Sequence, residues 1–236
     1  MKTTSIVAII TARGGSKRIP RKNIKEFMGK PMLAYAVEAA LKSNLFDTVM
    51  VSTDDDEIAE VAKAYGAEVP FMRSERAASD YATTYDVLQE VITEYRKREM
   101  FYDKICCIYP CVPFLTAGTL KAAYAKMTES YDAVMPVCRF PVPVEWSFKL
   151  DDNGGIKADN PAATLIRSQD LIPRYYDAGM FYFLRTTTML SEKTINPARM
   201  AAYLIDEMEC QDIDTEDDWK SAELKYKIVR GNKTNG

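Results

Sequence analysis

Apolar runs alternate with helical patterns through the first half of the chain. Residues 5–11 (SIVAIIT) form an uninterrupted apolar run, as expected for a strand that is buried on both faces of a sheet. Further strands are predicted at residues 47–53, 68–71, 103–109 and 132–138, and helices at 30–44, 57–66, 84–98 and 116–129. This alternation requires a mostly parallel sheet with right-handed crossovers, so the sequence predicts an α/β fold with helices on both faces.

Capping residues mark the ends of two of these helices. Pro31 stands at a position that favours a helix start. Asp54, with Glu57 three residues later, predicts the N-cap of the next helix, and Gly66 predicts its end.

The alternation stops between residues 139 and 177. This stretch is rich in Pro and Gly and contains DNGG, a hairpin pattern, between two short strand-like pieces. A non-helical excursion of this length is typical of a binding or interface element. A strand follows at 180–184 and a final helix at 215–229. We expect one domain over residues 1–230, with 139–177 as an inserted lobe and 231–236 as a disordered tail.

Composition limits the possible functions. With 236 residues, 47% of them hydrophobic, the chain can bury the core of a folded domain. The net charge of −3 argues against a general nucleic-acid binder, so any anion site has to be local. No apolar run reaches the length of a membrane span, and the N-terminus fits a first strand better than a signal peptide.

The chain contains no histidine, which excludes Cys–His pairs, Ser–His–Asp triads and histidine metal sites. Its five cysteines are odd in number and lack CxxC spacing, so we expect reduced, mostly buried thiols in a cytoplasmic protein. Chemistry must therefore depend on Lys, Arg, Asp, Glu, Tyr and bound ions.

A glycine-containing basic loop follows the first strand, in the stretch IITARGGSKRIPRKN. Gly14 and Gly15 let the backbone approach a ligand closely, and successive N–H groups together with Ser16 can cradle phosphate oxygens. The loop carries five basic residues, which suit a triphosphate: Arg13, Lys17, Arg18, Arg21 and Lys22. A solvated surface loop is the alternative. Its place at the carboxyl end of a strand in an open sheet favours ligand binding.

Two aspartates near the C-terminus form a candidate metal site. Asp212 and Asp214 are two residues apart, so in an extended segment both carboxylates point the same way. Mg²⁺ is commonly held by one or two carboxylates plus phosphate oxygens and waters. Alternatively, Asp214 or Thr215 caps the last helix, with Asp217 or Asp218 completing the box.

The loop sequence IITARGGSKRIPRKNI resembles the signature of the cytidylyltransferases that activate nine-carbon acidic sugars. Further similarity in GKPMLAYAVEAAL, VSTDD, FMRSERAASDYATT, YDAGMFYF and QDIDTEDD extends it over most of residues 6–227. The resemblance implies a Rossmann-like domain with a small β-rich dimerisation lobe, CTP and Mg²⁺ as ligands, and a homodimer.

Carried over to this chain, the resemblance implies roles for four groups of residues. Catalysis at the CTP triphosphate would depend on Arg13, Lys17 and Lys22. Nucleotide binding would add Ala12, Gly14, Gly15, Ser16, Asn23, Arg73, Ala78 and Asp80. The sugar acid would meet Tyr109, Arg167, Gln169 and Asp177. The metal would bind Asp212 and Asp214. A surface arginine is the alternative for Arg73, and the aromatic residues of 175–183 are expected to pack in the core or an interface.

The expected reaction transfers CMP from CTP to the anomeric hydroxyl of a nine-carbon acidic sugar and releases pyrophosphate. The stretch YPCVPF, with Tyr109 and Cys111, departs from the sialate pattern and favours pseudaminic acid, with legionaminic or N-acetylneuraminic acid as alternatives. A non-catalytic nucleotide-binding module is the alternative from another class.

Overall fold

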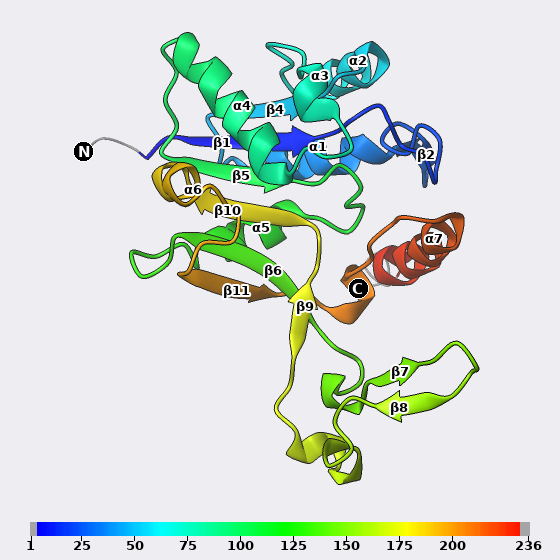
Figure 1. Cartoon of the computed structure of the whole chain (residues 1–236). Helices are drawn as coiled ribbons and strands as arrows, with labels where there is room; N and C mark the ends of the chain where they lie inside the picture. Colours follow the sequence, from blue (N-terminus) through cyan, green and yellow to red (C-terminus); the bar gives the residue numbers. More distant parts are fainter. Residues whose placement is uncertain (1–3, 232–236) are drawn as a thin grey trace.

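A computed structural model describes residues 4–231, and its centre is a seven-stranded sheet (Figure 1). The strand order is β11-β6-β10-β5-β1-β4, and β9 pairs with β6 outside this row. Five strands run in one direction, while β9 and β10 are antiparallel to their neighbours. The mostly parallel α/β fold is thereby confirmed. The strands are β1 (Ile6–Thr11), β4 (Thr48–Ser52), β5 (Lys104–Ile108), β6 (Ala133–Arg139), β9 (Tyr175–Asp177), β10 (Phe181–Arg185) and β11 (Met200–Leu204).

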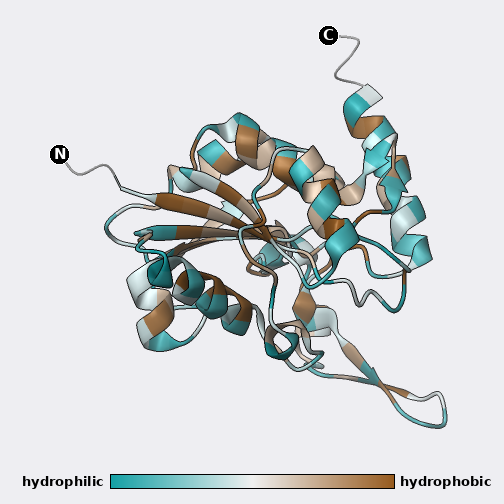
Figure 2. Ribbon diagram, turned by 90° about the horizontal axis from the view of Figure 1, so that it is seen from above, coloured by the Kyte–Doolittle hydropathy of each residue, from teal (hydrophilic) through white to brown (hydrophobic). Residues whose placement is uncertain are grey.

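Helices cover both faces of the sheet. Successive side chains of β1 point to opposite faces and are apolar, so each face presents an apolar surface on which helices pack. Ala8 and Ile10 pack with α1 (Met32–Ser43), α2 (Asp56–Ala64) and α5 (Ala117–Tyr124). Val7 and Ile9 pack on the opposite face with α4 (Thr84–Lys97) and α6 (Thr186–Glu192). Figure 2 shows the apolar strands between helices whose outer faces are polar.

A third apolar cluster lies beyond the carboxyl end of β1. It joins the basic loop, through Ile19, to α7 (Glu216–Gly231) and to the segment before it, through Ile213 and Trp219. The short strand β2 (Glu26–Phe27) contributes Phe27 to it and pairs with β3 (Lys30–Pro31), and α3 (Glu75–Ala78) packs against α4. Figure 1 shows α7 at the same end of the sheet as the loop that carries β2.

Three local predictions differ from the structure. The helix predicted at residues 116–129 ends early, since α5 stops at Tyr124. Asp55, not Asp54, caps α2 by accepting a hydrogen bond from the Ile58 N–H (3.0 Å). The strand predicted at residues 68–71 is wrong, because only an isolated bridge between Met50 and Glu68 forms. Pro70 has no N–H with which to extend that pairing.

Of the predicted lobe, residues 139–177, the part from 140 to 174 leaves the sheet (Figure 1), while Arg139 and β9 at its two ends pair within it. The predicted hairpin is confirmed as β7 (Phe148–Leu150) paired with β8 (Ile156–Ala158), and Gly154 in the turn has φ of 83°. Ala163 is the one buried residue of the lobe. Short 3-10 turns complete this part of the chain and its approach to α7: Val144–Trp146, Ala163–Leu165, Ser168–Asp170 and Glu207–Glu209.

The remaining predictions concern the chain end and its cysteines. The final helix begins at Glu216 and continues to Gly231, two residues past its predicted end. The rest of the predicted tail, residues 232–236, lies outside the described residues. All five cysteines are free and four are buried, as expected. No helix between residues 4 and 231 is long and apolar enough to cross a membrane.

Candidate active site

The basic loop is held in shape by polar contacts at both of its ends. The Gly14 N–H donates to Asp54 Oδ1 (2.9 Å), and a Cβ at Gly14 would lie 2.8 Å from Asp55 Oδ2, so any larger residue there would have to displace the Asp55 side chain. Asn23 is 4% exposed, and its Nδ2 donates to the Arg13 carbonyl (2.8 Å). This bond connects the start of the loop to its end, so Asn23 acts as a brace for the backbone.

Two of the N–H groups expected to face phosphate are engaged within the protein. Gly14 donates to Asp54, and Ser16 donates to the Gly14 carbonyl (2.9 Å). Side chains therefore supply most of the positive charge that the loop presents.

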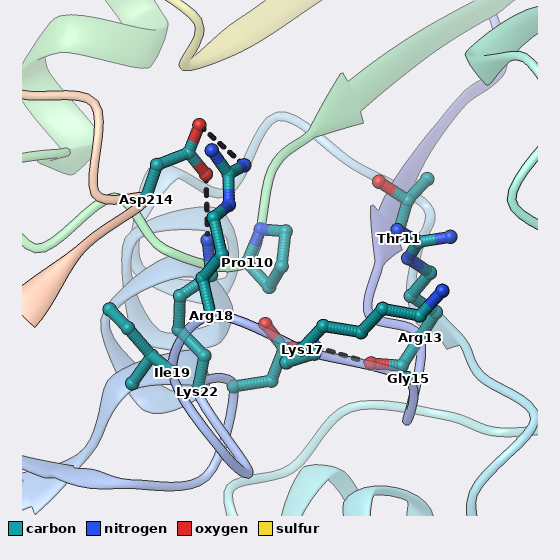
Figure 3. A pocket seen from close by; sticks show the side chains of 11 residues that line it. Thr11, Arg13, Gly15, Lys17, Arg18, Ile19, Lys22, Pro110 and Asp214 are labelled. Carbon is teal, nitrogen blue, oxygen red and sulfur yellow. Dashed lines mark hydrogen bonds and ion pairs between the residues drawn. The ribbon is translucent and has the colours of Figure 1, made fainter.

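These side chains surround a cavity of about 380 Å³ (Figure 3). Arg13, Lys17, Arg18 and Lys22 reach it from the loop, and Asp214 reaches it from the segment before α7. The lining residues are Thr11, Arg13, Gly15, Ser16, Lys17, Arg18, Ile19, Lys22, Asn23, Pro110 and Asp214. Four cations and one carboxylate thus face the same space, although Lys22 and Asp214 are 192 residues apart.

The third apolar cluster brings Asp214 to this cavity. Ile213 is 1% exposed and packs in one cluster with Ile19, which is equally buried. Lys22 Nζ donates to the Ile213 carbonyl (2.5 Å) and to Asp214 Oδ1 (3.3 Å). Arg18 pairs with Asp214 Oδ2 (2.8 Å), as Figure 3 shows. Apolar burial therefore anchors the residue between the two aspartates, and ion pairs orient the second carboxylate.

Neither aspartate is used to cap α7. The Thr215 hydroxyl accepts from the Asp218 N–H (3.2 Å), and Asp218 Oδ2 accepts from the Thr215 N–H (2.8 Å). Of the two capping alternatives, Thr215 with Asp218 is confirmed and Asp214 is wrong. Burial first, and the neighbouring Asp214 second, raise the pKa of the Asp212 carboxyl. The charge of Lys22 lowers this pKa in part, and a further cation beside the carboxyl would lower it more.

A cation in this place would need ligands from outside the protein. Across residues 4–231, no group of three or more His, Cys, Asp or Glu side chains is arranged to hold a metal ion. Asp214 lines the cavity, whereas Asp212 lines neither cavity but is near enough to Asp214 for the two charges to interact. Two such carboxylates fit the usual Mg²⁺ environment, in which substrate phosphate and water complete the coordination shell.

A second cavity of about 250 Å³ adjoins the first, since Thr11 and Arg13 line both. Arg73 lines it and is 8% exposed, so the alternative of a surface arginine is wrong. Its Nε donates to Ser52 Oγ (3.0 Å), and burial lowers the pKa of its guanidinium. The other lining residues are Ala77, Ser79, Asp80, Ala82, Thr83, Thr84, Val87 and Tyr109, while Ala78 and the fully buried Ala12 line neither cavity.

Tyr109 and Asp177 lie on either side of a buried tyrosine. The Tyr109 and Tyr182 rings are 5.6 Å apart, and the Tyr182 hydroxyl donates to Asp177 Oδ2 (2.6 Å). Arg167 and Gln169 lie elsewhere, in the lobe, and line neither of the two adjoining cavities. Arg167 Nε pairs with Asp170 (2.8 Å) and its side chain is 73% exposed.

The site has the charge and the two adjoining compartments of a nucleotide-binding cleft, and comparison with known proteins identifies its family. A family model described as cytidylyltransferase matches residues 7–229. The chain belongs to the cytidylyltransferase family. It is a CTP-dependent nucleotidyltransferase.

Curated relatives of this cytidylyltransferase act on acidic sugars. It is 39% identical to the pseudaminic acid cytidylyltransferase of Campylobacter jejuni, over 94% of this chain and 96% of the relative. It is 30% identical to the CMP-N,N'-diacetyllegionaminic acid synthase of Legionella pneumophila, over 92% and 94% of the two chains. It is 34% identical to N-acylneuraminate cytidylyltransferase A of Danio rerio, over 95% of this chain and 51% of that protein.

A solved structure supports the same fold. CMP:2-keto-3-deoxy-manno-octonic acid synthetase, complexed with CTP, superposes with a TM-score of 0.67 at 16% identity, and the match covers 94% of this chain and 98% of the other. The Rossmann-like architecture of the cytidylyltransferase is thereby confirmed.

Sequence reasoning missed several residues around the cytidylyltransferase cleft. Thr11 and Pro110 line it at the ends of β1 and β5, and their position after a buried strand was the available signal. Asp54 and Asp55 follow β4 and bind the loop through the Gly14 N–H and the Arg21 side chain. The sequence pattern assigns Asp54 only a helix-capping role. Cys111 lies beside Asn23, and burial raises the pKa of its thiol to about 12, which excludes it as a nucleophile near neutral pH.

Proposed function

We propose that this protein transfers CMP from CTP to the anomeric hydroxyl of a nine-carbon acidic sugar, with pseudaminic acid as the sugar. The observation that carries the proposal is the cavity in which four loop cations face Asp214. The sugar is inferred from the 39% identity to the Campylobacter jejuni enzyme, which exceeds the 30% and 34% to the legionaminic acid and N-acylneuraminate enzymes.

The triphosphate would lie in the larger cavity and the nucleoside in the smaller one, with Arg13 beside the junction. The sugar hydroxyl would attack the α-phosphorus in line with the departing pyrophosphate. Such transfers depend on positioning and on charge neutralisation, which Arg13, Lys17 and Lys22 can supply without histidine. Lys22 is the best-oriented of the three, since its ammonium is fixed by the Ile213 carbonyl and its side chain is only 20% exposed.

Asp212 and Asp214 would hold Mg²⁺ together with phosphate oxygens. The bound ion would offset charge on the phosphates and lower the pKa of the attacking hydroxyl. The raised pKa of Asp212 supports this assignment, because burial beside another carboxylate disfavours its charged form even with Lys22 nearby, and a bound divalent cation would favour it.

The lobe supports the proposal of a homodimer. Its large apolar side chains are mostly exposed although the lobe has almost no core of its own. An isologous two-fold contact would cover them and would let Arg167 and Gln169 of one subunit reach the sugar pocket of the other. More than half exposed are Val142, Phe148, Leu150, Ile156, Leu165 and Ile172. The free cysteines support a cytoplasmic location for this dimer.

The decisive experiment measures pyrophosphate release from CTP with a panel of pseudaminic, legionaminic and N-acetylneuraminic acids. Pseudaminic acid is expected to give the highest kcat/KM. A preference for one of the others would replace the proposed sugar, and CTP binding without turnover on any acid would establish a non-catalytic module. Light scattering on the same sample tests the dimer, which a fully active monomer would contradict.

A matched pair of lysine variants tests the site itself. Lys22→Ala is expected to lower kcat by at least about a hundredfold without unfolding, as expected when a charged donor is lost from a phosphoryl-transfer site. Lys42→Ala removes an equal charge from a pair with Glu38 on α1 and should leave turnover unchanged. Equal activity of the two variants would remove Lys22 from the mechanism.

A further inference from the structure

Two phosphate-facing cations of the loop share a single carboxylate. Asp80 accepts from Arg13 Nη1 (3.0 Å) and from Lys17 Nζ (2.6 Å). Within residues 4–231, no other carboxylate pairs with either cation, and no other group donates to the Asp80 carboxylate. Asp80 lies after α3 and thus comes from a part of the chain more than sixty residues away from the loop.

These ion pairs lie at the junction of the two cavities. Arg13 lines both, Lys17 lines the larger and Asp80 lines the smaller. A ligand that filled both cavities would have to pass Arg13, whose guanidinium is bonded to Asp80. The carboxylate therefore competes for the cations that a phosphate chain in the larger cavity would use.

We propose that Asp80 is an internal counter-ion of the phosphate loop, displaced when the triphosphate binds and re-paired with Arg13 and Lys17 as pyrophosphate leaves. The proposal rests on the function proposed above and adds a role in product release. It differs from a direct nucleotide contact, because Asp80 then weakens the binding of phosphate ligands instead of strengthening it.

The contacts of Asp80 suit a reversible exchange. Its side chain is 52% exposed and its two partners are 43% and 77% exposed, so water can solvate all three groups when the pairs open. The carboxylate of Asp214, which also lines the larger cavity, is held more firmly than that of Asp80. Asp214 pairs with Lys22, which is 20% exposed and also bonded to a backbone carbonyl. The loop thus has one pairing that opens easily and one that is anchored.

The charges of Arg13, Lys17 and Asp80 also favour displacement of Asp80 by the triphosphate and its return as pyrophosphate leaves. With Asp80 nearby, Arg13 and Lys17 keep a counter-charge at every stage, before the triphosphate binds and after pyrophosphate has gone. Without it, no carboxylate would compete with pyrophosphate for the two cations, and only water would replace it when it leaves. Removing the Asp80 charge is therefore expected to strengthen pyrophosphate binding and to slow its dissociation.

The test compares Asp80→Asn with Glu75→Gln, a matched control that removes the same charge from α3 at an exposed position with no ion pair in the described chain. Calorimetry with pyrophosphate alone, without metal, is expected to show about fivefold tighter binding for Asp80→Asn, the scale of exposed pairs. Glu75→Gln should remain within about twofold of the parent protein. Product inhibition by pyrophosphate should strengthen in parallel, and thermal melts check that both variants fold.

Unchanged or weaker pyrophosphate binding by folded Asp80→Asn would overturn the proposal and leave the direct nucleotide contact in its place. Equal tightening by Glu75→Gln would also overturn it, since the effect would then come from net charge. The parent protein separates this failure from failure of the proposed function. If it releases pyrophosphate from CTP while Asp80→Asn does not bind pyrophosphate more tightly, only the role of Asp80 fails.

Discussion

Replacing Ile213 by alanine tests whether apolar burial positions the two aspartates that are proposed to bind Mg²⁺. Ile213 lies between Asp212 and Asp214, is 1% exposed, and packs in the cluster with Ile19 and Trp219. The change removes three buried carbons, about 2.4 kcal/mol of transfer free energy at 0.8 kcal/mol each. The cavity left behind adds to this, but the segment is irregular and can partly relax, so we expect a loss of about 3 kcal/mol in the free energy of unfolding.

The functional effect should exceed what this loss of stability explains. Once Ile213 no longer anchors the segment, both carboxylates and the carbonyl bonded to Lys22 can move, so the Mg²⁺ concentration for half-maximal turnover should rise about tenfold. Urea unfolding and a magnesium titration of pyrophosphate release measure the two effects. Ile92→Ala, at a 3% exposed site on α4 across the sheet, is the control for stability alone.

Two outcomes would refute this reasoning. One is an Ile213→Ala protein that loses stability but keeps the magnesium dependence of the parent, which would mean that the aspartates are positioned by polar contacts alone. The other is an equal shift in magnesium dependence for Ile92→Ala, which would trace the effect to general loosening of the fold.

Two further predictions concern stability and loop shape. Asp132→Asn should cost about 1–2 kcal/mol at pH 7, because Arg199 donates to both carboxylate oxygens (2.7 and 2.9 Å) and holds the Asp132 pKa below its usual range. Since that contribution exists above the unfolded pKa of about 3.9 and is lost as pH falls through the lower folded pKa, parent and variant urea curves should converge in acid. Gly14→Ala should weaken CTP binding about tenfold, because the new Cβ would lie 2.8 Å from Asp55 Oδ2. In the control Gly15→Ala the new Cβ meets nothing within 4 Å, so this variant should bind CTP nearly as the parent protein does. Equal affinities of the two variants by calorimetry would show that the loop does not need the close approach at Gly14.

Local patterns were sufficient for the longer elements of the first half of the chain, but not for residues 68–71 or for the short β2, β3 and α3. The uninterrupted run of β1 needed burial on both faces, and the central position of β1 between β4 and β5 supplies it. Shorter elements later in the chain, among them β9, β11 and α6, carried no such pattern. They have three, five and seven residues, and their hydrogen bonds depend on the strands or helix beside them.

The residue types of the loop were enough to predict a phosphate site, but they did not predict which carboxylate would pair with its cations. Paired glycines and a run of basic residues after a strand indicate a phosphate site in any open parallel sheet. That Asp80 would pair with Arg13 and Lys17 depends on how α3 is placed over the loop, since their ion pairs join residues 63 and 67 positions apart. Spacing along a chain contains no information about such contacts.

The amino-acid sequence by itself determined the alternation of strands and helices, the glycine-containing basic loop after the first strand, and the two carboxylates at Asp212 and Asp214. That neither of them caps α7 was decided by the structure. Tertiary structure alone decided that the loop cations and Asp214 share one cavity, because burying Ile19 and Ile213 in a shared cluster is what brings Asp214 to Lys22. It also decided that Arg167 and Gln169 lie outside that cavity, on a lobe with too few buried side chains to fold back over it. The free energy of burying apolar surface, which depends on the whole fold, set both outcomes.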